Sequence, residues 1–230
     1  MFSISVDTEW VPQLMLDEMV EILNNYNIKA TFFVTNSYDF SKMERHELAI
    51  HPNFEENNNL NDVLKKTISH LPTKMSKGSR SHKIFHTSKL LTEYKNFGIE
   101  YASNYYLPNY EKPIPFFYGH TDILEIPFFF ADYQFSTSPK FDISTLNLND
   151  DGVKVFLFHP FHIFINTHNL DEYESLKQNY NDLDYLESKK DYDIPGNRNI
   201  FFKILDYIKD NKIEPKTMLE INNSYRINCN

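Results

Sequence analysis

The chain has 230 residues, of which 41% are hydrophobic and 24% charged, a composition typical of a soluble globular protein with a substantial core. Its net charge of −9 argues against the basic surface with which proteins bind nucleic acid or an anionic membrane. No stretch of the sequence reaches the roughly 20 apolar residues that a membrane span requires.

Apolar residues recur at spacings that predict short strands alternating with helices. The predicted strands cover residues 2–6, 30–35, 47–51, 79–85, 99–105, 123–130, 153–165 and 217–221. The predicted helices cover residues 13–25, 60–71, 87–97 and 198–210. This alternation favours parallel β–α–β units, and therefore a barrel or a doubly wound sheet. Residues 166–196 are rich in polar residues and are interpreted as an insertion in a single domain spanning residues 1–230.

The cysteine content bears on the compartment in which the protein works. Cys229 is the only cysteine, so no disulfide can form within the chain. The N-terminal residues also lack the charged and apolar regions of a signal peptide. We therefore expect a reducing, cytoplasmic location.

Ionisable side chains end or follow several of the predicted strands. These residues are Asp7, Glu9, His51, Arg80, His82, His159 and His162. In parallel sheets and barrels, functional side chains gather at the carboxyl ends of the strands. We therefore expect these seven side chains to meet at one rim of the fold.

Asp7 and Glu9 lie two residues apart in the sequence S-V-D-T-E-W. Two carboxylates at this spacing leave a strand on the same side, where they repel each other unless a positive group lies between them. A divalent metal would supply that charge, since carboxylates and imidazoles form open catalytic sites for zinc and similar ions. The alternative is a carboxylate pair in a solvated loop.

Three further candidates lie on the next strands. His51 ends an apolar strand directly before Pro52, where it either binds a metal or hydrogen-bonds a turn. Arg80 and His82 lie on the same side of their predicted strand. Arg80 would then orient a carboxylate such as Asp7, and His82 would complete a metal shell. A surface salt bridge and a structural histidine are the alternative.

The sequence F-L-F-H-P-F-H-I-F-I places His159 and His162 in an otherwise apolar run. Burying two imidazoles without polar partners costs free energy, which favours a functional role for this segment. The other histidines are interpreted as structural or surface residues: His46, His70, His86, His120 and His168.

Taken in chain order, these segments resemble the NodB-homology polysaccharide deacetylases of the carbohydrate esterase 4 superfamily. S-V-D-T-E-W occupies the place of the family's first motif, usually T-F-D-D-G, and the strand A-T-F-F-V follows it. H-E-L-A-I-H-P-N-F lies where the metal-binding histidine motif is found, S-R-S-H lies near the arginine motif, and F-L-F-H matches the late L-x-H motif. The residues of these motifs are most similar to those of the WbmS-like subgroup, which is found in gene clusters for O-antigen and other surface polysaccharides.

The resemblance implies a distorted (β/α) barrel of about seven parallel strands that carries out metal-assisted amide hydrolysis. It implies that Asp7 is the general base, that Arg80 tethers this base, and that His159 protonates the leaving amine. Glu9 and His51 would bind a divalent metal, with zinc preferred over cobalt or nickel.

The chain departs from the family pattern at two positions. The family's second histidine, four residues after the first, is Glu55 here. The third metal ligand would therefore be Glu55, His162 or, as we prefer, His82. The usual second carboxylate of the first motif is Thr8, which moves the metal-binding role to Glu9.

The leading hypothesis is a metal-dependent deacetylase that acts on an N-acetylated sugar or sugar conjugate in surface-polysaccharide biosynthesis. One alternative is a hydrolase of another non-peptide C–N amide bond. A second alternative is a catalytically inactive carbohydrate-binding domain of the same fold, whose aromatic residues, 16% of the chain, would stack on sugars. Asp132, which follows I-P-F-F-F-A, would support His159.

Overall fold

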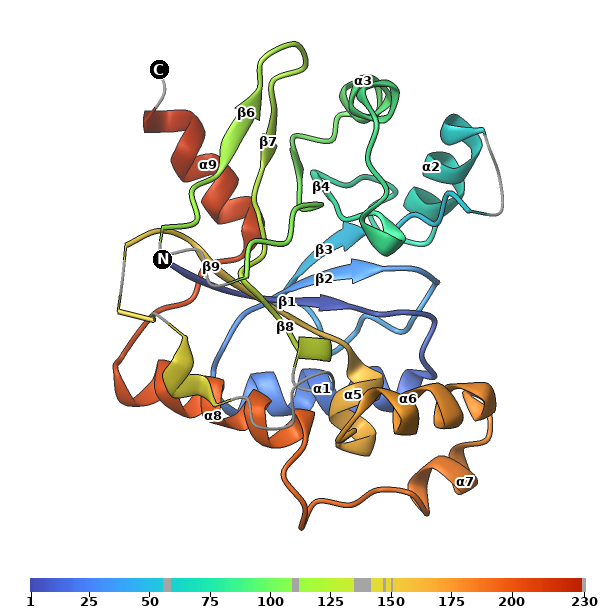
Figure 1. The fold of residues 1–230 in the computed structure, drawn as a ribbon. Helices are drawn as coiled ribbons and strands as arrows, with labels where there is room; N and C mark the ends of the chain where they lie inside the picture. Colours follow the sequence, from blue (N-terminus) through green and yellow to red (C-terminus); the bar gives the residue numbers. More distant parts are fainter. Residues whose placement is uncertain (56–58, 109–111, 135–141, 147, 150, 229–230) are drawn as a thin grey trace.

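A parallel sheet forms the centre of the computed structural model, which describes all residues except 56–58, 109–111, 135–141, 147, 150 and 229–230 (Figure 1). Cys229 therefore lies outside the described residues. The strands are β1 (Phe2–Asp7), β2 (Thr31–Val34), β3 (Glu47–Ile50), β4 (Gly78–Ser79), β5 (Tyr101–Ala102), β6 (Phe116–Tyr118), β7 (Ile123–Glu125), β8 (Phe130–Ala131) and β9 (Lys154–Phe158). They pair in the order β6-β7-β5-β4-β3-β2-β1-β9-β8, and each pair is parallel except β6 with β7.

Residues 123–131 join the two sides of this curled sheet, since β7 pairs with β5 and β8 pairs with β9. Between these strands, the Phe128 amide donates to the Tyr105 carbonyl at 2.9 Å and the Phe129 amide donates to the Val155 carbonyl at 2.8 Å. If residues 123–131 are counted as one bent strand, they complete a ring of seven parallel strands with β1 to β5 and β9. The predicted distorted (β/α) barrel is thus confirmed, and β6 is an antiparallel addition.

Helices cover the outside of the sheet. They are α1 (Gln13–Asn25), α2 (Leu60–Ser69), α3 (Ser88–Asn96), α5 (Pro160–Ile165), α6 (Leu170–Leu176), α7 (Leu183–Glu187), α8 (Asn197–Asp210) and α9 (Met218–Asn228). In Figure 1, α1, α5 and α8 lie below the sheet, while α2 and α3 lie above it. Among the described residues, no helix is long and apolar enough to cross a membrane.

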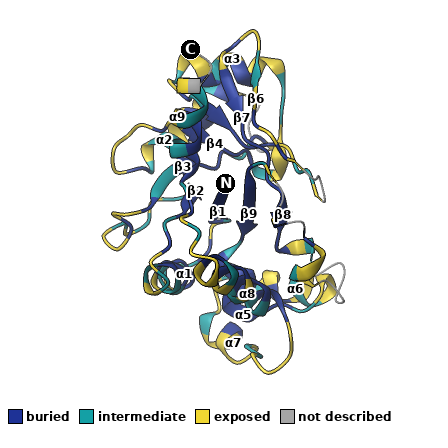
Figure 2. Cartoon of the chain, turned by 90° about the vertical axis from the view of Figure 1, so that its left-hand side faces the viewer, coloured by how far each residue is buried: buried dark blue, intermediate teal, exposed yellow. Residues whose placement is uncertain are grey.

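Apart from β6 and the first half of β3, the residues of the strands are buried (Figure 2). On β1, Ile4 and Val6 belong to the large cluster packed against the helices, whereas Ser5 and Asp7 alternate with them and face the interior. A second apolar cluster fills the interior, and α9 contributes Met218 to it. Polar groups enter the interior of the barrel from β1 and also at the amino ends of β2 and β3, where Thr31 Oγ1 donates to Glu47 Oε2 at 2.7 Å.

Several predicted strands are shorter than the sequence pattern suggested. The prediction over 79–85 fails after Ser79, because His82–Ile84 forms a 3-10 turn. The prediction over 153–165 ends at Phe158, because Pro160 begins α5 at a position that suits its missing N–H. The prediction over 217–221 is wrong, because α9 begins at Met218.

Gly78 supplies a test of the interior packing. A Cβ at this position would lie 1.9 Å from Cζ of Tyr101, whose ring fills the neighbouring space. We expect Gly78→Ala to lower the free energy of unfolding by about 1–3 kcal/mol, because the core would be overpacked. Urea denaturation would measure the change. Gly119→Ala is the matched control, since a Cβ added there would meet nothing within 4 Å, and an equal loss in both variants would contradict the packing described here.

Candidate active site

A buried ion pair lies at the carboxyl end of β1. Arg80 Nη1 donates to Asp7 Oδ1 at 2.9 Å, and the two side chains are 1% and 5% exposed. Arg80 also donates to Ser5 Oγ, and to the carbonyl and hydroxyl oxygens of Ser103. Its guanidinium lies 4.3 Å from the ring centre of Phe33. These contacts fix the Asp7 carboxylate and leave Oδ2 free of the guanidinium.

The chain turns sharply immediately after β1. Glu9 and Trp10 have φ values of 45° and 58°, in the left-handed region that side chains other than glycine seldom adopt. Thr8 is fully buried, and its Oγ1 accepts a hydrogen bond from the Thr35 amide at 3.1 Å. The Trp10 amide in turn donates to Thr35 Oγ1 at 3.1 Å. These bonds hold the strained turn and direct the Glu9 side chain toward two histidines.

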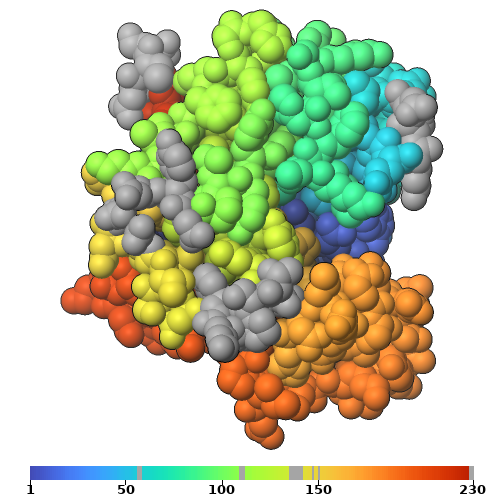
Figure 3. Space-filling model, viewed as in Figure 1, coloured from blue at the N-terminus to red at the C-terminus, as the bar shows by residue number. Residues whose placement is uncertain are grey.

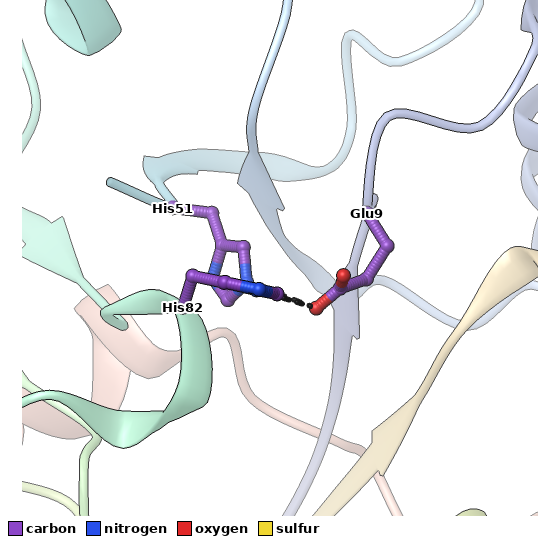
Figure 4. Close-up of side chains that lie close together, drawn as sticks. All are labelled: Glu9, His51 and His82. Carbon is purple, nitrogen blue, oxygen red and sulfur yellow. Dashed lines mark hydrogen bonds and ion pairs between the residues drawn. The ribbon is translucent and has the colours of Figure 1, made fainter. Parts of the chain in front are cut away.

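The Glu9 carboxylate faces His51 and His82, whose imidazoles lie side by side, as Figure 4 shows. The distances to Glu9 Oε1 are 3.3 Å from His51 Nε2 and 3.1 Å from His82 Nδ1. Burial alone would raise the pKa of Glu9, but the hydrogen bonds from both imidazoles hold this pKa well below its usual range. The carboxylate is therefore ionised at neutral pH.

The cluster of Glu9, His51 and His82 has a donor set that fits a divalent metal. Ligand atoms bound to tetrahedral zinc at 2.0–2.2 Å lie about 3.3–3.6 Å apart, close to the two distances that separate Glu9 Oε1 from the imidazole nitrogens. His51 is 1% exposed and its Nδ1 has no hydrogen-bond partner among the described residues. This nitrogen lies 3.9 Å from Asp7 Oδ2, so the cluster adjoins the ion pair.

Asp132 and His159 form a second pair at the same rim, after β8 and β9. His159 Nδ1 donates to Asp132 Oδ1 at 2.7 Å, and the His159 amide donates to Asp132 Oδ2 at 2.6 Å. Burial would lower the pKa of His159, but the charge of Asp132 and this hydrogen bond outweigh it and raise the pKa to about 9. The predicted contact between Asp132 and His159 is thus present. His159 Nε2 lies 4.0 Å from Glu9 Oε1.

The other two candidates for a third ligand lie differently. Glu55 is half exposed, pairs with Lys83 at 2.7 Å, and lies no closer than 4.0 Å to His82 Nε2. His162 lies on α5 rather than on a strand, and its Nδ1 is 2.7 Å from Thr167 Oγ1. Burial lowers the pKa of His162 to about 4, so this imidazole is neutral at pH 7.

The polar insertion contributes residues near the site that the sequence did not reveal. In Figure 3, a recess separates the green and teal surface of the middle segments from the orange surface that includes α6, with blue N-terminal atoms between them. The Tyr173 ring on α6 lies 4.6 Å from the ring centre of His162. Burial, followed by the charge of Glu9, raises the pKa of Tyr173 to about 12. In the sequence, the only indication of Tyr173 was that tyrosines occur within the polar segment of residues 166–196.

Four of the remaining histidines have local partners, and one of these, His86, stacks on the Tyr118 ring at 5.2 Å between ring centres. His46 accepts a hydrogen bond from the Ala30 amide, and His168 lies 3.1 Å from Glu172. His120 is exposed, as is Asp122, which pairs with Lys95. His70 is half-buried beside Ser37. None of these residues belongs to the clusters that could hold a metal among the described residues.

The Asp132–His159 pair predicts a pH effect. We expect Asp132→Asn to lower the pKa of His159 from about 9, because burial would remain while the charge of Asp132 would be lost. A raised histidine pKa stabilises the fold below pH 6.5, and this contribution is lost as the pH rises through 9. The variant should therefore lose most stability below pH 6.5.

An NMR titration of the His159 ring in metal-free protein would measure this pKa directly. His46 is the internal control, because burial and Arg45 lower its pKa to about 4 without any contribution from Asp132. A His159 pKa that stays near 9 in the variant would refute the assigned cause.

Comparison with known proteins places this geometry in a family. The sequence model of the WbmS-like polysaccharide deacetylases matches residues 4–177. No curated protein sequence matches the chain. The crystal structure of a putative polysaccharide deacetylase involved in O-antigen biosynthesis, WbmS from Bordetella bronchiseptica, is similar with a TM-score of 0.78 and 21% identity, and the alignment covers 90% of each chain.

Two further deacetylase structures are more distant. A putative polysaccharide deacetylase from Mycobacterium smegmatis has a TM-score of 0.47 at 15% identity, with 94% of this chain and 92% of that chain covered. The catalytic domain of a peptidoglycan N-acetylglucosamine deacetylase from Eubacterium rectale has a TM-score of 0.42 at 16% identity, with 79% and 84% covered. The family match spans most of the sequence and includes Asp7, at the end of β1, and His51, Arg80 and His159, which directly follow β3, β4 and β9. This chain therefore belongs to the WbmS-like polysaccharide deacetylase family.

Proposed function

We propose that the chain is a metal-dependent deacetylase that removes the acetyl group from an N-acetylated sugar during surface-polysaccharide biosynthesis. The observation that carries the proposal is the position of Glu9 Oε1, within 4.0 Å of nitrogens from His51, His82 and His159. Potential metal ligands, a tethered carboxylate and a charged imidazole thus surround one point at the carboxyl rim of the barrel, where (β/α) barrels carry out their chemistry.

Glu9, His51 and His82 would hold the metal. His82 is preferred over Glu55 as third ligand because its Nδ1 already lies 3.1 Å from Glu9 Oε1, whereas the Glu55 carboxylate is engaged by Lys83. His162 is set apart by its hydrogen bond to Thr167. Zinc suits one carboxylate and two imidazoles, and cobalt or nickel would also be accepted. When bound, the metal would polarise the acetyl carbonyl and lower the pKa of a water molecule.

Asp7 would act as the general base. Its Oδ1 is occupied by Arg80, so Oδ2 is the oxygen that takes a proton from the attacking water. Oδ2 faces His51 at 3.9 Å, which places the base beside the metal ligands. Arg80 orients the carboxylate and keeps its negative charge stable in a buried position.

His159 would act as the general acid. Asp132 holds Nδ1 at 2.7 Å, so Nε2 is the nitrogen that donates a proton to the leaving sugar amine. The pKa of about 9 keeps this imidazole protonated at neutral pH, as an acid requires. After acetate leaves, the amine carries the proton that His159 supplied.

The family, and the role of the similar Bordetella protein in O-antigen biosynthesis, support an N-acetylated sugar as the substrate. Hydrolysis of another non-peptide C–N amide bond is the second candidate, because the same acid, base and metal would serve any such amide. A sugar-binding domain without activity would lack the base function assigned to Asp7.

Metal content tests the ligand assignment. We expect about one zinc, cobalt or nickel ion per chain in protein purified without a nickel column, and a loss of at least tenfold in affinity in His82→Ala, because one of three protein ligands is removed. Glu55→Gln is the matched control and should keep the metal. Elemental analysis of dialysed protein would decide, and retention by His82→Ala with loss by Glu55→Gln would reverse the assignment.

Acetate release from N-acetylated sugars tests the chemistry. We expect Asp7→Asn to lower kcat by about 10²–10⁴-fold while the metal stays bound, since a neutral amide cannot accept the proton. Asp122→Asn, at an exposed acid, is the control. If wild-type protein with bound metal released no acetate from sugars but hydrolysed other amides, the second candidate would be favoured. Full activity of Asp7→Asn would reject the assigned base.

A further inference from the structure

A cavity of about 400 Å³ lies between Trp10 and α2. His51 forms part of its wall, so the cavity adjoins the cluster assigned above to the metal. Its far side is formed by α2, including Asp62 and Lys66, and by His70 directly after that helix. None of these α2 residues enters the mechanism described above. The cavity is therefore an unassigned space beside the reaction centre.

The polar groups that line the cavity include the Lys66 ammonium, the Asn53 amide and the Asp62 carboxylate. Lys66 makes no ion pair or hydrogen bond through its ammonium group to any described residue. Asn53 Oδ1 accepts from the Glu55 amide at 3.0 Å, which leaves the side-chain nitrogen of Asn53 as a donor. The one carboxylate, Asp62, already accepts a hydrogen bond from Asn59 Nδ2 at 2.7 Å.

Lys66 is the cation of the cavity. His70 lies beside it, but burial, Lys66 and Lys74 lower the pKa of His70, so this imidazole is neutral at pH 7. The chain as a whole carries a net charge of −9, which repels anions over most of its surface. An ammonium group with no ion pair to a described residue, in a cavity that His51 also lines, would therefore distinguish an anionic ligand from a neutral one.

Trp10 supplies a flat apolar surface at the mouth of the same cavity. It is the only tryptophan of the chain, it is 38% exposed, and its ring packs edge-on against His82 at 5.0 Å. Its backbone is held by Thr35, so the ring is positioned by the strained turn after β1. An exposed indole in a fixed position offers a stacking surface for a sugar ring.

Resting on the proposed deacetylase function, we infer that this cavity binds an acidic group of the substrate at Lys66, with the sugar portion against Trp10. The substrate class is thus an anionic N-acetylated sugar. The shared chemistry is a carboxylate or phosphate oxygen that accepts a charge-assisted hydrogen bond from the ammonium group. A uronic acid carboxylate and the diphosphate of a nucleotide-linked sugar both carry such oxygens.

The test uses fluorescence of Trp10, excited where tyrosine does not absorb, in full-length protein stripped of metal. The probes are N-acetylglucosamine, N-acetylglucosaminuronic acid and UDP-N-acetylglucosamine, and calorimetry serves as a check because uridine absorbs ultraviolet light. We expect at least one acidic probe to bind about 10-fold or more tightly than the neutral sugar, as a charge-assisted bond allows. The identity of that probe distinguishes a carboxylate from a diphosphate.

Lys66→Ala should reduce the affinity for the acidic probe to that for the neutral sugar. Lys65→Ala is the matched control, because Lys65 is the adjacent exposed lysine of α2 and does not line this cavity. Unchanged affinity in Lys66→Ala, equal binding of the neutral sugar, or no binding of any probe would overturn the inference. Failure of the proposed function would be seen separately, as absent metal or absent acetate release, since binding is measured without either.

Discussion

The charge of Arg80, buried inside the barrel, is the constraint on which the other features of the site depend. Removing a guanidinium and a carboxylate from water costs several kcal/mol for each ion, so the pair persists only where every donor is satisfied. Here the partners come from β1 and from the segment after β5, with Phe33 of β2 beneath the guanidinium. Strands far apart in sequence must therefore end at the same level. Their common end forms the floor of the site.

The ion pair between Arg80 and Asp7 also makes the surroundings of Asp7 differ from those of Glu9. Asp7 is held from one side, so its orientation is set before any substrate or metal arrives. Glu9 Oε1 is contacted by the imidazoles of His51 and His82 at 3.3 and 3.1 Å and, more distantly, by that of His159 at 4.0 Å. The fixed carboxylate of Asp7 is suited to proton transfer, which needs an oxygen in a set position. The carboxylate of Glu9, which faces imidazoles, is suited to coordinating a metal.

The candidate site was predicted from the principle that functional side chains gather at the carboxyl ends of parallel strands, which does not depend on the length of the strands. Asp7, His51 and His159 follow apolar runs, and this pattern survives even where the strands are short. The predicted strand over residues 79–85 was wrong at His82, which lies on a 3-10 turn after a strand of two residues, although its side chain still reaches Glu9. Such strands are stabilised by pairing with both neighbours and not by local propensity, so their ends leave little trace in the sequence. The cavity at Lys66 depends on how α2 packs, which no local pattern encodes.

The turn at Thr8 and Glu9 explains how the chain departs from the usual first motif without losing the geometry. Thr8 is fully buried, and its hydroxyl accepts from the Thr35 amide and lies 3.0 Å from Thr35 Oγ1, so the side chain at position 8 serves to hold the turn. The left-handed backbone at Glu9 moves the carboxylate function one residue along the chain, at a strain of about 1–3 kcal/mol. Glycine at position 9 would relieve this strain but would remove the carboxylate that faces His51 and His82.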